Sequence, residues 1–502
     1  MADIKPSMDK ALSHVESAPG TMPEGKERAA KPEVRFSLWQ TLGMNFSITC
    51  TPLSIGAQLA LIIGLGGSPF YIWGFFVAAI FQLITCVALA EVASAIPHSS
   101  GPAYWVQHLA PENCSLFFGY LVGWTTNGFW WFLTVANCLY LAQFTVGLAE
   151  ALNPGYTPDP WHSYMVYIGY VTILFVINLP GLFKAVLHCM TSGVIIINLS
   201  FLFILITLLV RATPKPSARE VFVQVVNESG WSSEGVVFCI ALIPGVVGVF
   251  AFDSVTHITE EVTQPSKQVP QVMIGSATIS AISGFVMTIV YSFSITNPAN
   301  LLQPFAQQPL LQLIYDTCRS TALTGIATSG IIISFFLASV GGFTSWNRLY
   351  WSLSREGVLP FSRTMSKLTT RDKLPLNALY ANYILTVALG AVQLGSLTAL
   401  NAIIGGGLIC MTTSYSMTLG LALWRGRSCL PADRWLNLGR LGPVLQIISV
   451  LWGCFISVWL CFPLMMPVTL AYMNWASVVF VGLVLCTLIY WVMIFRWRHE
   501  NQ

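Results

Sequence analysis

Residues 49–56 read Thr-Cys-Thr-Pro-Leu-Ser-Ile-Gly, and residues 250–257 read Phe-Ala-Phe-Asp-Ser-Val-Thr-His. Each stretch interrupts a long apolar segment, and the two interruptions are about 200 residues apart. Proline, glycine and polar side chains in the middle of an apolar helix free backbone groups that lipid cannot satisfy. Such a break persists only where protein or a water-filled cavity covers it, so the pair predicts where a polar site lies.

Composition places the chain in a membrane. Of its 502 residues, 55% are hydrophobic and only 9% are charged, and the mean hydropathy is +0.68. A soluble domain carries about 25% charged residues. Helices that cross a bilayer need about 20 apolar residues, and the sequence contains twelve such runs. We therefore expect an all-α membrane protein with 12 transmembrane helices, of which helices 1 and 6 are broken.

The order of the apolar runs predicts two inverted halves. Each half holds five helices, and an odd number makes the second half insert upside down relative to the first. This predicts a five-plus-five inverted repeat, followed by two further helices. The expected segments are a disordered cytosolic tail (1–36), helices 1–5 (37–211), an extracellular loop (212–234), helices 6–10 (235–424), a cytosolic loop (425–442), helices 11–12 (443–495) and a cytosolic tail (496–502).

Lysine and arginine are distributed unevenly across the predicted membrane. With the N-terminus in the cytosol, twenty of the 24 fall on the inner side and four on the outer side. This excess predicts that both termini are cytosolic. Residues 1–36 lack the apolar core that a signal peptide needs. The predicted outer loop contains the sequon Asn227-Glu228-Ser229, which makes Asn227 a candidate glycosylation site whose occupancy stays open.

The first break offers hydroxyls and backbone donors. Pro52 disrupts the preceding turn, and the helix that restarts after it points its free N–H groups at the membrane midplane. We expect these donors to meet a substrate carboxylate. The candidate substrate-binding residues here are Thr51, Ser54, Ile55 and Gly56. The alternative is a proline kink whose freed carbonyls are capped by serine and threonine hydroxyls.

The second break holds a carboxylate at membrane depth. Asp253 and His257 are four residues apart, so on a continuous helix they share a face and can form part of a proton relay. The alternative role for Asp253 is to cap the half-helix that begins near Ser254. Phe250 and Phe252 flank the break, and their ring faces can hold an ammonium group. We take Phe250, Phe252, Asp253 and Ser254 as candidate substrate-binding residues, and Asp253 and His257 as coupling residues.

Two further charged residues are candidates for a gate. Glu91 lies at the inner end of the second apolar run, where it can pair with a base such as Arg348 and close the inner side. The alternative is an exposed acid at the membrane interface.

No motif for a metal, a cofactor or an enzyme is visible. The twelve cysteines are scattered without metal-ligand spacing, and neither GxSxG nor HExxH occurs. We expect no metal site, no cofactor and no nucleic-acid partner. A membrane-embedded enzyme is a remote alternative, because only His257 among the seven histidines adjoins a deep acid.

Three stretches carry a family resemblance. Residues 88–105, from Ala-Leu-Ala-Glu to Pro-Ala-Tyr-Trp, are the first. Residues 250–270 hold Phe-Asp, Thr-His, Glu-Glu-Val and Val-Pro, and residues 346–360 run from Trp-Asn-Arg to Gly-Val-Leu-Pro. Together they resemble the amino acid–polyamine–organocation (APC) superfamily, in its fungal branch of choline, GABA and amino-acid permeases. The resemblance covers about 37–495.

This resemblance implies a LeuT-like fold and a function. It implies a plasma-membrane permease, proton-coupled by family analogy, that imports an amino acid, choline, GABA or a related amine by alternating access. A transporter-like nutrient sensor is the alternative. The chain departs from the family at Pro102, where a second glycine is usual, and in residues 51–56, which hold fewer glycines. We therefore expect the site to bind a cationic amine more firmly than a carboxylate.

Overall fold

The computed structural model describes residues 36–59, 63–153, 155–370, 373–395, 397–469 and 473–496. The predicted tails therefore lie almost wholly outside the described residues. Within the described part, nine helices are long and apolar enough to cross a membrane. The two broken segments and the short helix α17 (Leu376–Gly390) are the other predicted spans, and they fall short of that length. The number twelve therefore remains a prediction.

Helices make up nearly all of the regular structure. The first half contains α2 (Leu38–Thr49), α3 (Thr51–Ser54), η1 (Ile55–Gln58), α5 (Gly67–Ala95), α6 (Pro102–Leu109), α7 (Ser115–Leu152), α8 (Pro160–Ile177), η2 (Pro180–Leu182) and α9 (Phe183–Arg211). A connection with α10 (Ala218–Phe222) follows. Strands β1 (Leu65–Gly66) and β2 (Val226–Asn227) pair antiparallel and tie this connection to the loop before α5.

The second half repeats the pattern of a broken helix followed by long ones. It contains α11 (Glu234–Ile240), α12 (Ile243–Gly248), η3 (Ser254–Glu261), α13 (Pro265–Ser294), η4 (Pro298–Leu302), η5 (Phe305–Gln307), α14 (Pro309–Cys318), α15 (Thr321–Arg355), α16 (Ser362–Met365), α17, η6 (Ala391–Leu394) and α18 (Leu397–Arg425). After η7 (Arg427–Cys429), the chain ends with α19 (Leu441–Trp459), α20 (Ala476–Tyr490) and η8 (Trp491–Phe495).

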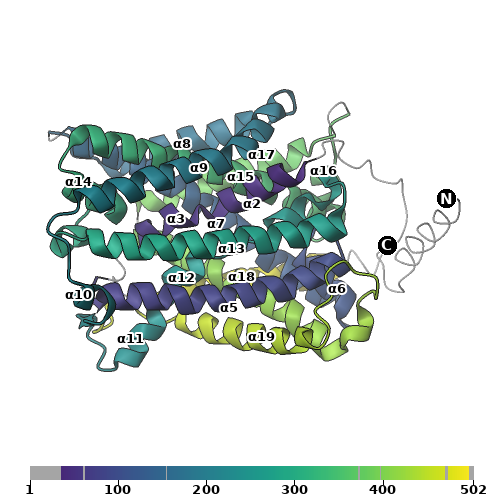
Figure 1. Ribbon diagram of the computed structural model, residues 1–502. Helices are drawn as coiled ribbons and strands as arrows, with labels where there is room; N and C mark the ends of the chain where they lie inside the picture. Colours follow the sequence, from purple (N-terminus) through teal and green to yellow (C-terminus); the bar gives the residue numbers. More distant parts are fainter. Residues whose placement is uncertain are drawn as a thin grey trace, which may run out of the picture.

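The long helices run side by side between two ends of a bundle (Figure 1). One end carries α6 and α16 and is called the proximal end here. The other carries α10, α11 and α14 and is called the distal end. The broken segments α2–α3 and α12–η3 lie inside, because α13 packs on α2, α3 and η3 while α15 packs on α2 and η3.

Both breaks occur at a residue in the left-handed region of backbone conformation. Cys50 has φ 43° and separates α2 from α3, two residues before Pro52. Ala251 has φ 52° in the gap between α12 and η3. The hydroxyl of Tyr291 donates to the Pro52 carbonyl at 2.8 Å, and that of Tyr71 donates to the Ile55 carbonyl at 2.9 Å. Side chains of α13 and α5 thus satisfy carbonyls at the first break.

The loop that holds the candidate glycosylation site is ordered by local hydrogen bonds. Asn227 is exposed, its amide nitrogen donates to the Trp231 carbonyl at 2.8 Å, and its carbonyl oxygen accepts from the Ser229 N–H and hydroxyl. The Ser229 side chain is buried by these contacts. Whether Asn227 carries a glycan therefore stays a prediction.

Candidate functional site

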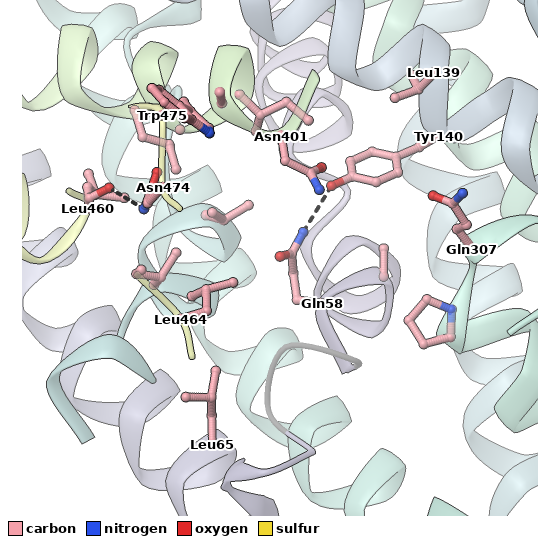
Figure 2. Close-up of a pocket in the computed structure, with 18 of the residues that line it drawn as sticks. Gln58, Leu65, Leu139, Tyr140, Gln307, Asn401, Leu460, Leu464, Asn474 and Trp475 are labelled. Atoms are coloured by element: carbon pink, nitrogen blue, oxygen red, sulfur yellow. Dashed lines mark hydrogen bonds between the residues drawn. The ribbon is translucent and has the colours of Figure 1, made fainter. Parts of the chain in front are cut away.

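Two neighbouring cavities reach the breaks. A vestibule of about 430 Å³ is lined by α7, α12, α18, the loop before α14 and the loop after α19. A small cavity of about 40 Å³ lies against α2, α7, α12 and α15. Gln58, Tyr140, Val247 and Leu408 line both cavities, so the small cavity is the inner end of the vestibule. Figure 2 shows the side chain of Gln58 directed at the Tyr140 hydroxyl, with a hydrogen bond of 3.1 Å between them.

Aromatic rings dominate the small cavity. Phe129, Phe132, Phe250, Phe335 and Tyr140 line it, with Phe129 packed edge-on against Phe250. Among the described residues that line the two cavities, none carries a charge. Ring faces attract an ammonium group, so the inner cavity can hold a cation without a carboxylate in contact.

The residues predicted at the first break are not all in the cavity. Ser54 lines it, and its hydroxyl also donates to the Thr49 carbonyl at 2.9 Å. The Ser54 N–H donates to the Cys50 carbonyl and that of Ile55 to the carbonyls of Thr51 and Leu53, so these donors are not free for a carboxylate. The expectation of free donors at Ser54–Gly56 is therefore wrong at Ser54 and Ile55, because the helix restarts three residues earlier.

The other two residues predicted at this break have structural contacts. The Thr51 hydroxyl donates to the Gly248 carbonyl at 2.6 Å and so joins the two breaks. Gly56 faces Leu310, whose side-chain atoms lie 2.8 Å from where a Cβ would be. Neither residue lines either of the two cavities. The alternative of a kink with capped carbonyls describes much of this break.

At the second break, only Phe250 lines the small cavity. Phe252 instead stacks on Tyr415, with ring centroids 5.1 Å apart. Asp253 is buried, and its Oδ1 accepts a 2.6 Å hydrogen bond from the Tyr415 hydroxyl. Ser254 donates to the side-chain oxygen of Asn45. Asp253 thus lies outside the cavity lining, and its own side chain makes no capping bond to η3.

Asp253 and His257 face each other as the spacing predicts. Asp253 Oδ2 lies 3.6 Å from His257 Nε2, and both atoms are buried without a hydrogen-bond partner in the described structure. His257 Nδ1 is 3.0 Å from the Ser99 carbonyl oxygen. A carbonyl only accepts, so Nδ1 carries a proton and Nε2 faces Asp253. The pair can therefore bind one exchangeable proton between Nε2 and Oδ2. The Trp130 ring packs edge-on against His257.

Asn45 joins the two breaks, and the sequence reading missed it. Its amide nitrogen donates to the Phe252 carbonyl at 3.1 Å and to the Ser276 hydroxyl, and its oxygen accepts from the Val255 N–H at 3.1 Å. Asn45 is 1% exposed. A buried asparagine in an apolar run, five residues before the break, is the signal that would have found it.

The proximal end is closed by buried ion pairs. Arg348 Nε lies 2.8 Å from Glu261 Oε1, with both side chains buried. Glu91 pairs with a base as expected, but the base is Arg434 at 3.0 Å, whereas Arg348, the base given as an example, pairs with Glu261. The basic residue that reaches Glu91 comes from the loop before α19, 343 residues away. The vestibule thus opens toward the distal end while ion pairs close the proximal end.

Comparison with known proteins decides the family. A family model described as amino acid permease matches residues 36–486, which is most of the chain. The chain belongs to the amino acid permease family. This permease is therefore a multi-pass membrane protein of the APC superfamily and a transporter rather than an enzyme, as the motifs indicated. The family also implies a LeuT-like fold.

Three relatives show the range of cargoes around this permease. A choline transporter of Saccharomyces cerevisiae is 28% identical over 484 residues, covering 96% of this chain and 84% of the relative. A 7-keto 8-aminopelargonic acid transporter of the same yeast is 26% identical over 520 residues, covering 91% and 92%. Amino-acid permease 2 of Neurospora crassa is 26% identical over 467 residues, covering 91% and 84%.

Proposed function

We propose that this permease is a secondary active transporter that imports an amino acid, choline, GABA or a related amine together with a proton. The observation that carries the proposal is the joint position of two sites. An aromatic cavity ends at the breaks of both broken helices, and the buried Asp253–His257 pair begins three residues beyond Phe250. Movement at one site therefore reaches the other through a few residues of backbone.

The aromatic cavity is the proposed substrate site. Its rings suit an ammonium group, and Ser54 and Gln58 add polar contacts at its edge. A volume of about 40 Å³ holds a few water molecules at most, so a substrate must widen the cavity as it enters from the vestibule. The amine of the relatives' cargoes fits this chemistry: one transports choline and another 7-keto 8-aminopelargonic acid.

The buried pair is the proposed proton site. With Nδ1 of His257 held by the Ser99 carbonyl, a proton that enters between Nε2 and Oδ2 neutralises the Asp253 carboxylate. The Tyr415 hydroxyl holds the other oxygen of Asp253 in place. Of the two roles predicted for Asp253, we therefore propose the coupling role and not contact with the substrate amine, because Asp253 lies outside the lining of the small cavity.

The twelve-span topology and the orientation are part of the proposal. The broken segments and α17 complete the nine long helices to twelve spans, and the halves 37–211 and 235–424 form the inverted repeats. The proximal end, which carries Arg348, Arg355 and Arg434 from the predicted inner side, is proposed to be the cytosolic side of the plasma membrane. The vestibule then faces the outside, as an importer requires before it binds its cargo.

An uptake panel tests the proposal. Cells that express the chain are given labelled choline, GABA and a set of amino acids at an acidic and a neutral external pH. We expect one class to accumulate above the vector control, and more strongly at acidic pH. If none of these compounds accumulates, the proposed substrate class is wrong. If the accumulation does not depend on external pH, the proposed proton coupling is wrong, while the assignment as a permease stands.

A further inference from the structure

A chain of hydroxyl groups joins two carboxyl groups at the proximal end, and it meets the Asp253–His257 pair only through the Ser99 carbonyl that accepts from His257 Nδ1. Ser99 Oγ donates to Glu260 Oε1 at 2.8 Å and lies 2.8 Å from Ser352 Oγ. Ser352 Oγ is 2.7 Å from Ser100 Oγ, which is hydrogen-bonded to Glu356 Oε1. The serines are buried. They belong to the loop after α5 and to α15, whereas Glu260 belongs to η3, so the chain ties three segments together.

These four hydrogen bonds need four protons. Each of the three hydroxyls supplies one, and an ionised carboxylate supplies none. With both carboxylates ionised, one of the four bonds must stay unmade. With one carboxyl protonated, all four form in a single direction, from that carboxyl through the serines to the other carboxylate. The chain is thus complete only when it holds one extra proton.

Ion pairing decides which carboxyl holds the proton. Arg355 lies 2.6 Å from Glu260 Oε1, which keeps Glu260 ionised. In the part of the chain that the structure describes, no lysine or arginine nitrogen pairs with Glu356. His98 Nδ1 is 3.6 Å from Glu356, but it accepts the Ser100 N–H at 3.1 Å and so has no proton of its own to donate.

The charged and titratable groups around Glu356 agree with this assignment. They are Arg355, Glu260, His98 and Tyr104, whose ring stacks on His98. Burial raises the pKa of Glu356 to about 7 and repulsion from Glu260 adds to the rise, against the Ser100 hydrogen bond and Arg355, which lower it. The proton therefore leaves near neutral pH.

We propose that Glu356, with the serine chain that leads from it to Glu260, is a second proton-binding site, which holds the proximal end closed while it is occupied. This extends the proposed function and does not depend on which substrate is carried. When the proton leaves, one of the four bonds is lost and two carboxylates share a network whose serines are buried. Release of a proton on the proximal side therefore favours opening toward that side.

The sign of the pH dependence follows from the two states. In the closed state Glu356 keeps its proton up to a pH near 7, whereas in water a glutamic acid loses it near pH 4.3. The closed state binds the extra proton between these values. Closure is therefore fully supported below about pH 4.3, and this support is lost as the pH rises from there through about 7.

Infrared difference spectroscopy of the purified full-length chain in lipid nanodiscs tests the site directly. We expect a protonated-carboxyl C=O band that disappears as the pH rises through about 7 in the unmodified chain. Glu356→Gln removes that band, because the amide cannot titrate. The matched control is Glu112→Gln, an exposed acid between α6 and α7, which leaves the band unchanged.

Ser352→Ala separates proton sharing from a merely structural role. Without the middle hydroxyl, Ser100 donates to Glu356 and Ser99 donates to Glu260, and no extra proton is needed. We expect the midpoint of the band to fall by about one pH unit, the equivalent of one hydrogen bond, and Ser352→Thr to restore it. A band near pH 7 that survives Glu356→Gln, or a midpoint that Ser352→Ala leaves in place, overturns the proposal. Neither the band nor its midpoint pH depends on the result of the uptake panel, so the two proposals can fail independently.

Discussion

The two carboxylate oxygens of Asp253 have different neighbours. One oxygen accepts a hydrogen bond from the Tyr415 hydroxyl, and the other faces His257 Nε2. The sequence placed Asp253 and His257 together because residues four apart share a helix face. It could not place Tyr415, since 162 residues separate it from Asp253 and no local pattern links them.

Replacement of Asp253 by asparagine tests the coupling at the level of one residue. Asparagine keeps the shape of the side chain but cannot bind and release the proton. We expect exchange of labelled substrate across the membrane to continue, while the accumulation ratio falls to about 1 because the coupling free energy is lost. The measurement is uptake into proteoliposomes with and without a pH gradient.

Asp316→Asn is the control for that experiment. Asp316 lies on α14 at the distal end, where it accepts from Asn300 and Gln312, far in the chain from the breaks. Its replacement should leave accumulation unchanged. A variant Asp253→Asn that accumulates substrate as the unmodified chain does would remove Asp253 from the coupling mechanism.

Two broken helices hold each other at their breaks. Asn45 of α2 makes hydrogen bonds to backbone groups on both sides of Asp253, and the Thr51 hydroxyl donates to a carbonyl at the end of α12. Proline and glycine in residues 49–56 predicted a break, yet the structure puts it at Cys50, where the sequence carries no breaker. The exact position follows from tertiary contacts of α3, which local propensity does not contain.

Replacement of Asn45 by alanine tests the link between the two elements. The change leaves the Phe252 carbonyl, the Val255 N–H and the Ser254 hydroxyl without this partner in a buried place. Each orphaned group costs about 1–3 kcal/mol, so we expect a clear fall in the apparent melting temperature and loss of uptake. Thermal unfolding in detergent measures the first effect.

Asn198→Ala is the matched control. In the part of the chain that the structure describes, the side-chain amide of Asn198 donates only within its own helix, to the Val194 carbonyl at 2.7 Å. We expect it to lower the melting temperature far less. Equal losses for the two variants would mean that Asn45 has no special role in joining the breaks.

The whole bundle is open at one end and closed at the other. The distal vestibule is lined by neutral polar and apolar residues, whereas the proximal end is closed by Arg348–Glu261, Glu91–Arg434 and Arg355–Glu260. Composition predicted a helical membrane protein, and the position of Glu91 at the end of an apolar run predicted an acid near the inner end. They did not predict the partners of the acids, because each pair joins segments that only the folded bundle brings together.

A double-mutant cycle on Glu91 and Arg434 tests how the closed end is held. Removing one member of a buried pair leaves an uncompensated charge and costs about 3–5 kcal/mol, so we expect Arg434→Gln to destabilise the chain strongly. Glu91→Gln with Arg434→Gln buries no charge and should lose less than the sum of the single changes. Melting temperatures, with hydrogen exchange of the proximal loops, measure this. Additive losses would show that the pair is not coupled.

Phe36, the first described residue, is fully buried against Phe183, and its N–H donates to the Glu261 carbonyl at 2.8 Å. The side chain of the same Glu261 holds Arg348. The start of the first span is thus attached to the residue that forms an ion pair at the proximal end. A change in the position of Phe36 would therefore act on Glu261. Shortened forms of this permease should therefore keep Phe36 if they are to close normally.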